Sequence, residues 1–192
     1  RSGDDEKGDE DLESWKATMF RAKVARANYL SQDRSGMQYA TKELCRQMSK
    51  PTEEDWQKLK RLGRYLVDKT RLRIIYVYQP RPEDVTISVD TDFAGCKRAR
   101  KSTSGGVVMH GAHLIKTWST TQSAIALSSG EAEYYGLVKG ASQGLGMRAM
   151  LTELGVESQV LVQTDASAAK GIALRRGLGK MTHRSEPAMG AR

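Results

Sequence analysis

The sequence predicts an α/β protein of the α+β kind, in which a mainly helical segment precedes a sheet flanked by helices. Apolar residues recur every three or four positions over much of residues 12–66, which is the pattern of amphipathic helices. Val85–Asp90 instead alternates β-branched with polar residues, which indicates a strand with one buried face. Pro80 and Pro82 lie between the two patterns, and we place a boundary between two folded regions there.

The first region contains three expected helices and one expected strand. Helices are expected over residues 12–30, over residues 37–48 and from Thr52 onward. Thr52 followed by Asp55 is a pairing that begins helices, because each side chain can bond the other residue's backbone N–H. The β-branched and aromatic run Leu72–Tyr78 is expected to form a strand that closes this region.

The second region begins with strands. Val85–Asp90, Val107–His110 and Leu114–Ser119 are expected to form a three-stranded antiparallel meander, since Gly111-Ala112 marks a tight turn between the last two. Val160–Thr164 is nearly all apolar, and we expect it to be a central strand of the sheet.

A long helix is expected between the third and fourth strands. Ser128 with Glu131 three residues later predicts a capping box at its start, and Gly155 predicts its end. The helix contains several glycines, which disfavour it by about 1 kcal/mol each relative to alanine, so tertiary packing must stabilise it. Small residues recur every four positions and would allow close approach to the sheet: Gly136, Gly140 and Gly144. A short helix over residues 166–174 follows the fourth strand.

The charge of this chain is unevenly distributed. Its 192 residues carry a net charge of +8, yet residues 1–13 hold seven acids against two bases. The rest of the chain is therefore more positive than the whole chain by five charges. A strongly basic body of this kind favours a polyanionic partner such as nucleic acid. No apolar run approaches the roughly 20 residues that span a bilayer, so we expect no membrane partner and an intracellular location, cytoplasmic or nuclear. Cys45 and Cys96 fit no zinc or disulfide pattern and are expected to be reduced.

Three carboxylates occupy places where apolar packing does not explain them. Asp90 ends the first strand of the second region, and Asp165 ends the fourth. Glu131 and Glu133 compete for a third position in the first turns of the long helix. Side chains two residues apart on a helix point in directions that differ by about 200°, so only one of these two glutamates can face the sheet. The capping box already gives Glu131 a structural role, which leaves Glu133 as the inward candidate.

Converging carboxylates repel one another unless cations lie between them. Oxygen ligands without histidine or cysteine favour Mg²⁺ or Mn²⁺ over Zn²⁺. A pair of such ions is a common device for displacement at phosphorus. The three acids therefore predict a metal-dependent phosphoryl-transfer site and no small-molecule substrate.

Several motifs resemble the ribonuclease H domain of Copia-type retrotransposon polyproteins. They are V-D-T-D-F-A-G-C, K-S-T-S-G-G, T-W-S-T-T-Q-S-A-I-A-L-S-S-G-E-A-E-Y and L-V-Q-T-D-A-S-A-A, within residues 85–183. Upstream, N-Y-L-S-Q-D-R-S-G-M-Q-Y-A-T-K-E-L and D-W-Q-K-L-K-R-L-G-R-Y-L resemble the connecting region that follows the polymerase. Composition and this resemblance together predict a division of the chain into an acidic disordered tail (1–13), a helical connection region (14–80), a truncated ribonuclease H-like region (83–183) and an irregular tail (184–192).

The resemblance also implies a function. It implies a ribonuclease H-like mixed sheet and two-metal hydrolysis of the RNA strand of an RNA–DNA hybrid. Asp90, Glu133 and Asp165 match the first, second and third metal-binding acids of the family. Asp92 lies beside them and matches no ligand. The candidates for holding the hybrid backbone are Lys97, Arg98, Arg100 and Lys101, and the polymerase part of the parent polyprotein is the expected protein partner.

The resemblance ends near His183. Gly179–His183 fits the family's entry into its last part, and His183 is a candidate for assisting product release. Glu186 is a weak substitute for the family's fourth acid, because Pro187 follows it and no apolar pattern surrounds it. The family's fifth strand and closing helix have no counterpart, so the sequence indicates a truncated domain. An inactive nucleic-acid-binding remnant is the alternative function.

Overall fold

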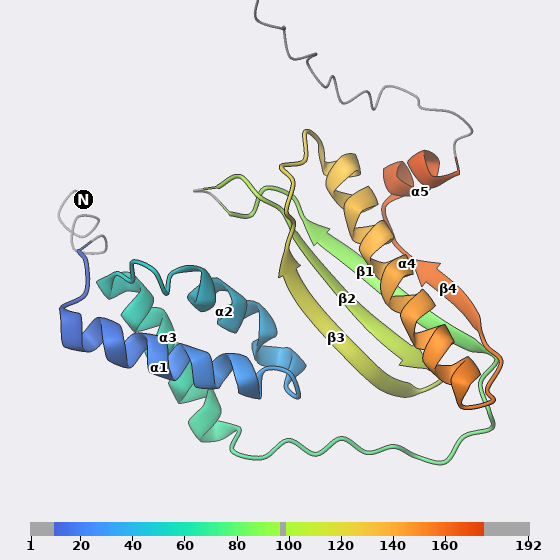
Figure 1. Ribbon diagram of the computed structural model, residues 1–192, viewed down its shortest axis with the longest axis horizontal. Coiled ribbons are helices and arrows are strands. Elements are labelled where there is room, and N and C mark those ends of the chain that lie inside the picture. The colour runs from blue at the N-terminus through green and yellow to red at the C-terminus, as the bar shows by residue number, and fades with distance from the viewer. Residues whose placement is uncertain (1–9, 97–98, 175–192) are drawn as a thin grey trace, which may run out of the picture.

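The computed structural model describes residues 10–96 and 99–174, and two hydrophobic cores lie within them. The first core belongs to three helices near the amino terminus, and the second lies between a four-stranded sheet and a long helix (Figure 1). The α/β class is therefore confirmed, and the mixed sheet with its helices is compatible with a ribonuclease H-like fold. Among the described helices, none is long and apolar enough to cross a bilayer.

The helical bundle consists of α1 (Ser14–Leu30), α2 (Ser35–Arg46) and α3 (Glu53–Asp68). Its core contains large side chains from all three helices: Phe20, Val24, Met37, Leu44, Leu59 and Leu62. The capping box predicted for α3 is present, because the Thr52 hydroxyl accepts from the Asp55 N–H while an Asp55 oxygen accepts from the Thr52 N–H. All three helices agree with the sequence prediction to within about two residues at most ends, which is the usual precision of a boundary.

The strand predicted at Leu72–Tyr78 is wrong. Residues 71–82 form no strand, and the large apolar side chains of residues 72–78 are exposed by between 48% and 97%. The stretch contacts the sheet through side chains: the Tyr76 hydroxyl donates to the Leu114 carbonyl at 3.0 Å, and the Gln79 amide donates to the His110 carbonyl at 2.9 Å. β-propensity measures how well residues fit a pleated, half-buried surface, and nothing in the described residues provides that surface here.

The sheet contains β1 (Asp84–Asp92), β2 (Thr103–His110), β3 (His113–Thr121) and β4 (Gln159–Gln163) in the order β3-β2-β1-β4. The predicted antiparallel meander β1-β2-β3 is confirmed, and β4 pairs with β1 in parallel. The prediction of a central fourth strand is wrong, because β4 lies at an edge of the described sheet. Its apolar residues Val160 and Val162 pack under a helix, whereas Leu161 on the other face is 46% exposed.

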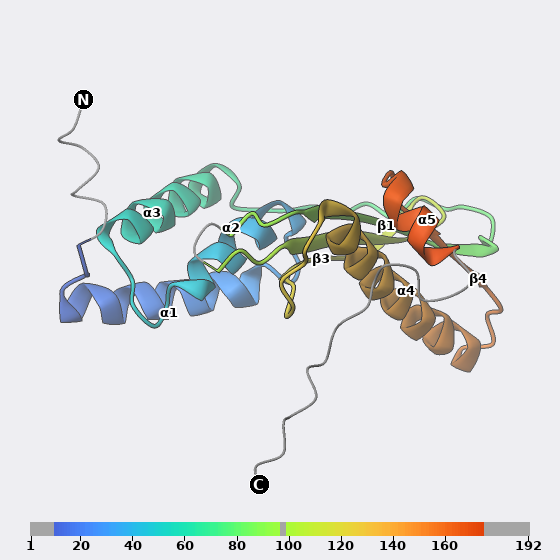
Figure 2. The same ribbon diagram turned by 90° about the horizontal axis from the view of Figure 1, so that it is seen from above.

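The long helix α4 (Ser129–Glu153) covers one face of the sheet (Figures 1 and 2). A Cβ atom at Gly136 would lie 2.4 Å from the Thr91 hydroxyl oxygen, and one at Gly140 would lie 2.4 Å from a methyl of Val89. The close approach predicted from the glycine spacing is thus present, and any larger side chain there would displace the helix. Gly155, with φ of +73°, ends α4 as predicted, because a left-handed residue lets the next N–H groups bond the last helical carbonyls.

The capping box predicted for α4 is half present. The Ser128 hydroxyl accepts from the Glu131 N–H at 3.1 Å, as predicted. The Glu131 carboxylate, however, accepts from the Leu127 N–H at 2.8 Å and from the Tyr135 hydroxyl at 2.7 Å. Glu131 is 8% exposed, so this carboxylate is a buried structural group that holds the start of the helix.

Helix α2 joins the helical bundle to the sheet through polar contacts. The Gln38 amide donates to the Thr117 carbonyl of β3 at 3.3 Å, and the Lys42 ammonium donates to the Thr103 hydroxyl of β2 at 2.7 Å. The two apolar cores share no residue. These side-chain hydrogen bonds therefore link the two parts, and Figure 2 shows α2 on the β3 side of the sheet.

Candidate active site

The three acids singled out by the sequence come from three different elements. Asp90 lies near the end of β1, Glu133 in the first turns of α4, and Asp165 two residues after β4. Because β1 and β4 are parallel neighbours, their carboxyl ends lie at the same edge of the sheet. That arrangement places Asp90 and Asp165 on adjacent strand ends beside the start of α4.

Close packing of α4 brings Glu133 to the same edge. Gly136, one turn after Glu133, allows the helix to touch Thr91 of β1. The helix α5 (Ser167–Ala173) begins directly after Asp165 and packs on the first turn of α4, where a Cβ at Gly130 would lie 3.1 Å from the Ala168 methyl. Gly136 and Gly130 therefore let α4 lie close to β1, which carries Asp90, and to α5, which follows Asp165.

The Glu133 carboxyl group feels the charges of both aspartates. The pKa of Glu133 is raised, first because burial disfavours its charged form, and then because the charges of Asp90 and Asp165 repel it. The Glu133 Oε2 atom is buried and has no hydrogen-bond partner among the described residues. An unpaired buried carboxylate oxygen is unfavourable, and a cation beside it would satisfy the oxygen and relieve the repulsion.

The donor atoms fit Mg²⁺ or Mn²⁺ in chemical type, since all three are carboxylates. In residues 10–96 and 99–174, however, no group of three or more histidine, cysteine, aspartate or glutamate side chains is close enough together to hold a metal ion. The observation that supports a cation here is thus the unpaired Glu133 oxygen and its repulsion by two acids. The site is not a preassembled cage.

Asp92 lies against the loop that follows β1. A Cβ at Gly95 would lie 1.7 Å from Asp92 Oδ2, so the carboxylate occupies the space above that glycine in the loop after β1. Its charge acts on Tyr39 of α2, whose pKa is raised by burial first, then by Glu43 and Asp92. Asp92 is not among the charges that raise the pKa of Glu133.

The basic loop between β1 and β2 is described in part. Lys97 and Arg98 lie outside the described residues, as do His183 and Glu186. Arg100 is exposed, and its φ of +54° places it in the left-handed region. Its N–H donates to the Cys96 carbonyl at 2.7 Å, and the Cys96 N–H donates to the Lys101 carbonyl at 3.1 Å. Cys96 therefore organises the turn that carries the predicted nucleic-acid contacts.

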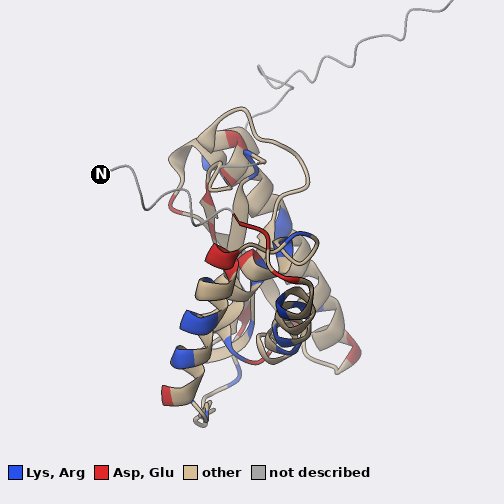
Figure 3. Cartoon of the chain, turned by 90° about the vertical axis from the view of Figure 1, so that its left-hand side faces the viewer, with Lys and Arg blue, Asp and Glu red and all other residues tan. Residues whose placement is uncertain are grey.

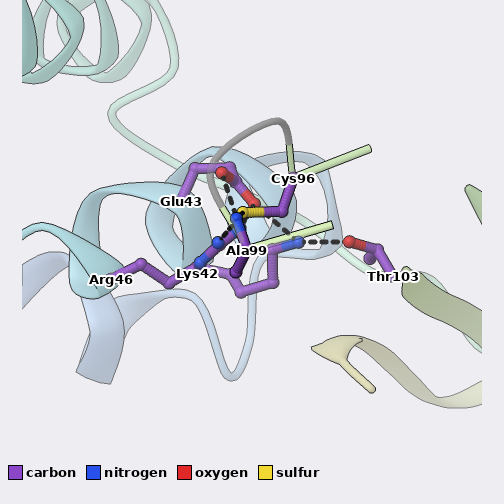
Figure 4. A network of polar contacts seen from close by, with 6 residues as sticks. All are labelled: Lys42, Glu43, Arg46, Cys96, Ala99 and Thr103. Atoms are coloured by element: carbon purple, nitrogen blue, oxygen red, sulfur yellow. Dashed lines mark hydrogen bonds and ion pairs between the residues drawn. The ribbon is translucent and has the colours of Figure 1, made fainter. Parts of the chain in front are cut away.

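Helix α2 contacts this loop through a polar network that the sequence prediction missed (Figure 4). The Arg46 guanidinium donates to the Cys96 sulfur and pairs with Glu43 at 3.2 Å, while Glu43 also pairs with Lys42 at 2.7 Å. The Ala99 N–H donates to the same sulfur at 3.3 Å. These partners are about 50 residues apart in the chain, so no local spacing could have shown the network.

Comparison with known proteins gives this geometry a context. The chain is 35% identical over 139 residues to a retrovirus-related Pol polyprotein from transposon RE1 of Arabidopsis thaliana, covering 72% of this chain and 9% of the polyprotein. It is 33% identical over 140 residues to the corresponding polyprotein from transposon RE2, covering 73% of this chain and 10% of that one. This chain resembles part of a retrotransposon Pol polyprotein.

A third relative is an uncharacterized mitochondrial protein of Arabidopsis thaliana, 33% identical over 124 residues. The match covers 65% of this chain and 51% of that protein. The chain thus spans about half of one relative and a tenth or less of the two polyproteins. No family model matches the chain, and no solved structure matches it.

Proposed function

We propose that the sheet with α4 and α5 is a ribonuclease H-like nuclease that hydrolyses the RNA strand of an RNA–DNA hybrid with the help of Mg²⁺ or Mn²⁺. The observation that supports this proposal is the environment of Glu133: its buried Oε2 atom has no hydrogen-bond partner among the described residues, and burial together with the charges of Asp90 and Asp165 raises its pKa. Similarity to retrotransposon Pol polyproteins supports the same class of protein.

Each acid has a definite role in this proposal. Asp90, Glu133 and Asp165 bind cations at the carboxyl ends of β1 and β4. The chemistry that two bound ions supply is activation of a water molecule and stabilisation of the leaving oxygen. Glu133 is the most buried of the three, and its Oε2 atom is shielded from solvent. Arg100 and Lys101, with Lys97 and Arg98, neutralise backbone phosphates, and the hybrid is recognised by its shape and 2′-hydroxyl groups.

The test is cleavage of a labelled RNA–DNA hybrid in the presence of Mg²⁺, by the unaltered chain and by Asp90→Asn and Asp165→Asn variants. We expect each variant to lower the rate by at least about 100-fold, because residues that merely support a metal ligand already cost 10- to 100-fold. Asp84→Asn is the matched control, since Asp84 lies on the same strand and the same face at its other end. Equal cleavage by the Asp90 and Asp84 variants would overturn the proposal.

A second measurement distinguishes this function from an inactive nucleic-acid-binding remnant, which the basic body of the chain favours. A cation bound by the native state raises its melting temperature. We expect Mg²⁺ to raise the melting temperature of the unaltered chain and to have a smaller effect on Asp90→Asn. Salt-dependent hybrid binding without cleavage and without this Mg²⁺ effect would support the remnant instead.

A further inference from the structure

A groove of about 590 Å³ lies between α1 and α3, on the part of the molecule remote from the three acids. Its floor is apolar: Leu59 and Leu62 of α3 and Ala27 of α1 are buried there. Met19 forms part of the wall and is 40% exposed, and Trp56 is partly buried. Two helices of one bundle thus leave an open apolar channel along their line of contact.

One lining position of the groove carries no side chain. Gly63 lines it, and a Cβ atom built at Gly63 would meet nothing within 4 Å. Glycine in a helix is unfavourable relative to alanine, and close packing explains it at Gly136 and Gly140. No such packing exists at Gly63 among the described residues. The space above it can receive a side chain from another molecule.

The rim of the groove has one sign of charge. The charged residues that line it are Lys23, Arg26 and Lys60, all exposed, and no carboxylate lines it. None of the three forms an ion pair within the part of the chain that the structure describes. Figure 3 shows the molecule from the side of the helical bundle, with both lysine or arginine and aspartate or glutamate segments along its helices.

An apolar floor with a basic rim selects the chemistry of the occupant. We propose that the groove binds an amphipathic helix that carries an apolar stripe flanked by aspartate or glutamate, supplied by a protein segment outside this chain. Such a helix fills a groove of this kind with side chains at i, i+3, i+4 and i+7. Its acids would face Lys23, Arg26 and Lys60, which raises the association rate and fixes its orientation.

Other occupants fit less well. Residues 1–9 are acidic but contain no apolar side chain, so they cannot fill the floor. A nucleic-acid backbone would match the basic rim and leave the exposed Met19 side chain in water. A second copy of the helical bundle would bring another set of cations against the same rim. These occupants are distinguishable outcomes of the experiment below.

The probe is a synthetic helical peptide with leucines at the four stripe positions and glutamates beside them. Its affinity is measured by fluorescence anisotropy, with shifts of the Met19 methyl and Trp56 indole resonances to locate binding. We expect the Gly63→Leu variant, in which a side chain fills the groove, to weaken binding by at least tenfold. Gly146→Leu is the matched control, because a Cβ at Gly146 in α4 also meets nothing within 4 Å. It should leave the affinity unchanged within about twofold.

A charge-reversal variant provides a second test of the proposal. The Lys23→Glu/Lys60→Glu variant should weaken the glutamate peptide and strengthen a matched peptide with lysines in place of the glutamates. Loss of binding in both the Gly63 and Gly146 variants, or in neither, would overturn the proposal, as would failure of the glutamate peptide to bind the unaltered chain. The proposal would also be overturned if Gly63→Leu abolished a concentration-dependent dimer, which indicates a second copy. If the groove variants bound an RNA–DNA hybrid more weakly but kept their affinity for the peptide, the groove would be assigned to nucleic acid instead.

Discussion

The helical bundle and the sheet unit achieve close packing in opposite ways. In the bundle, large side chains such as Phe20, Val24 and Met37 fill the space between three helices and are fully buried. In the sheet unit, α4 places Gly140 and Gly144 against Ile87 and Val89, so its backbone lies directly on the strands. The packing of the bundle therefore depends on large side chains that fill its interior, whereas the packing of the sheet unit depends on the absence of side chains at the glycines of α4.

This difference explains which part of the molecule can hold a charged site. The bundle surrounds its core with helices whose apolar residues follow helical spacing, and α3 begins at the Thr52 capping box that local preference favours. Helix α4 contradicts local preference at several glycines, and in return its Glu133 feels the charges of Asp90 on β1 and of Asp165 after β4. A site built from distant segments requires such close backbone approach, and four predictions test the contrast, from the largest expected effect to the smallest.

The largest effect is expected from Phe20→Ala in the bundle. Phe20 is fully buried, and removing a buried phenylalanine side chain costs about 3–5 kcal/mol through lost burial and the cavity that remains. Because the two cores share no residue, we expect the bundle to lose hydrogen-exchange protection while β1 and β2 retain theirs. Uniform loss of protection in both parts would show that they unfold as one unit and would break the comparison.

A paired glycine experiment tests the packing of α4. In Gly140→Ala the new methyl would lie 2.4 Å from a Val89 methyl, and we expect a net loss of about 1–3 kcal/mol from overpacking. In Gly146→Ala the methyl meets nothing within 4 Å, and the helix should gain about 1 kcal/mol from propensity alone. Denaturant unfolding measures both, and a gain at both sites would contradict the contact between α4 and β1.

The cap of α3 tests the local rules of the bundle. Thr52→Ala removes the hydroxyl that accepts from the Asp55 N–H, and we expect a loss of about 1 kcal/mol. Thr18→Ala is the matched control, because the Thr18 hydroxyl donates to the Ser14 carbonyl within an exposed part of α1 and caps no helix. Equal unfolding midpoints for the two variants would show that tertiary contacts, rather than the cap, begin α3.

The smallest effect is expected from Glu133→Gln and depends on pH. The folded-state pKa of Glu133 is raised, so its ionisation disfavours the folded state as pH rises from its ordinary pKa of 4.5 through the raised value. Above that range, and without divalent cations, the glutamine variant should melt at a slightly higher temperature than the unaltered chain, whereas at lower pH the two should coincide.

Glu153→Gln at the other end of α4 is the control for loss of one negative charge. It separates a general charge effect from the local repulsion at Glu133. If Glu133→Gln lowers the melting temperature at neutral pH without divalent cations, the inferred repulsion from Asp90 and Asp165 is absent.

The sequence by itself determined the elements whose signals are local. The three bundle helices, the Thr52 cap, the antiparallel meander and the role of Gly155 follow from side-chain spacing, turn chemistry and backbone freedom within a few residues. The glycine spacing in α4 also predicted close approach to the sheet. The choice of Glu133 over Glu131 rested on a capping box in which the Glu131 carboxylate would bond the Ser128 N–H. In the structure that carboxylate accepts from the Leu127 N–H and the Tyr135 hydroxyl, so Glu131 has a structural role through other partners.

Only the tertiary structure decided the features that join distant segments. Whether an apolar run becomes a central strand, an edge strand or no strand depends on what lies beside it, which is why β4 and Leu72–Tyr78 were mispredicted. The Arg46–Cys96 contact spans 50 residues, and the repulsion of Glu133 by Asp90 and Asp165 joins three elements. Local patterns encode backbone conformation, whereas these contacts exist only after the chain has folded and brought separate segments together.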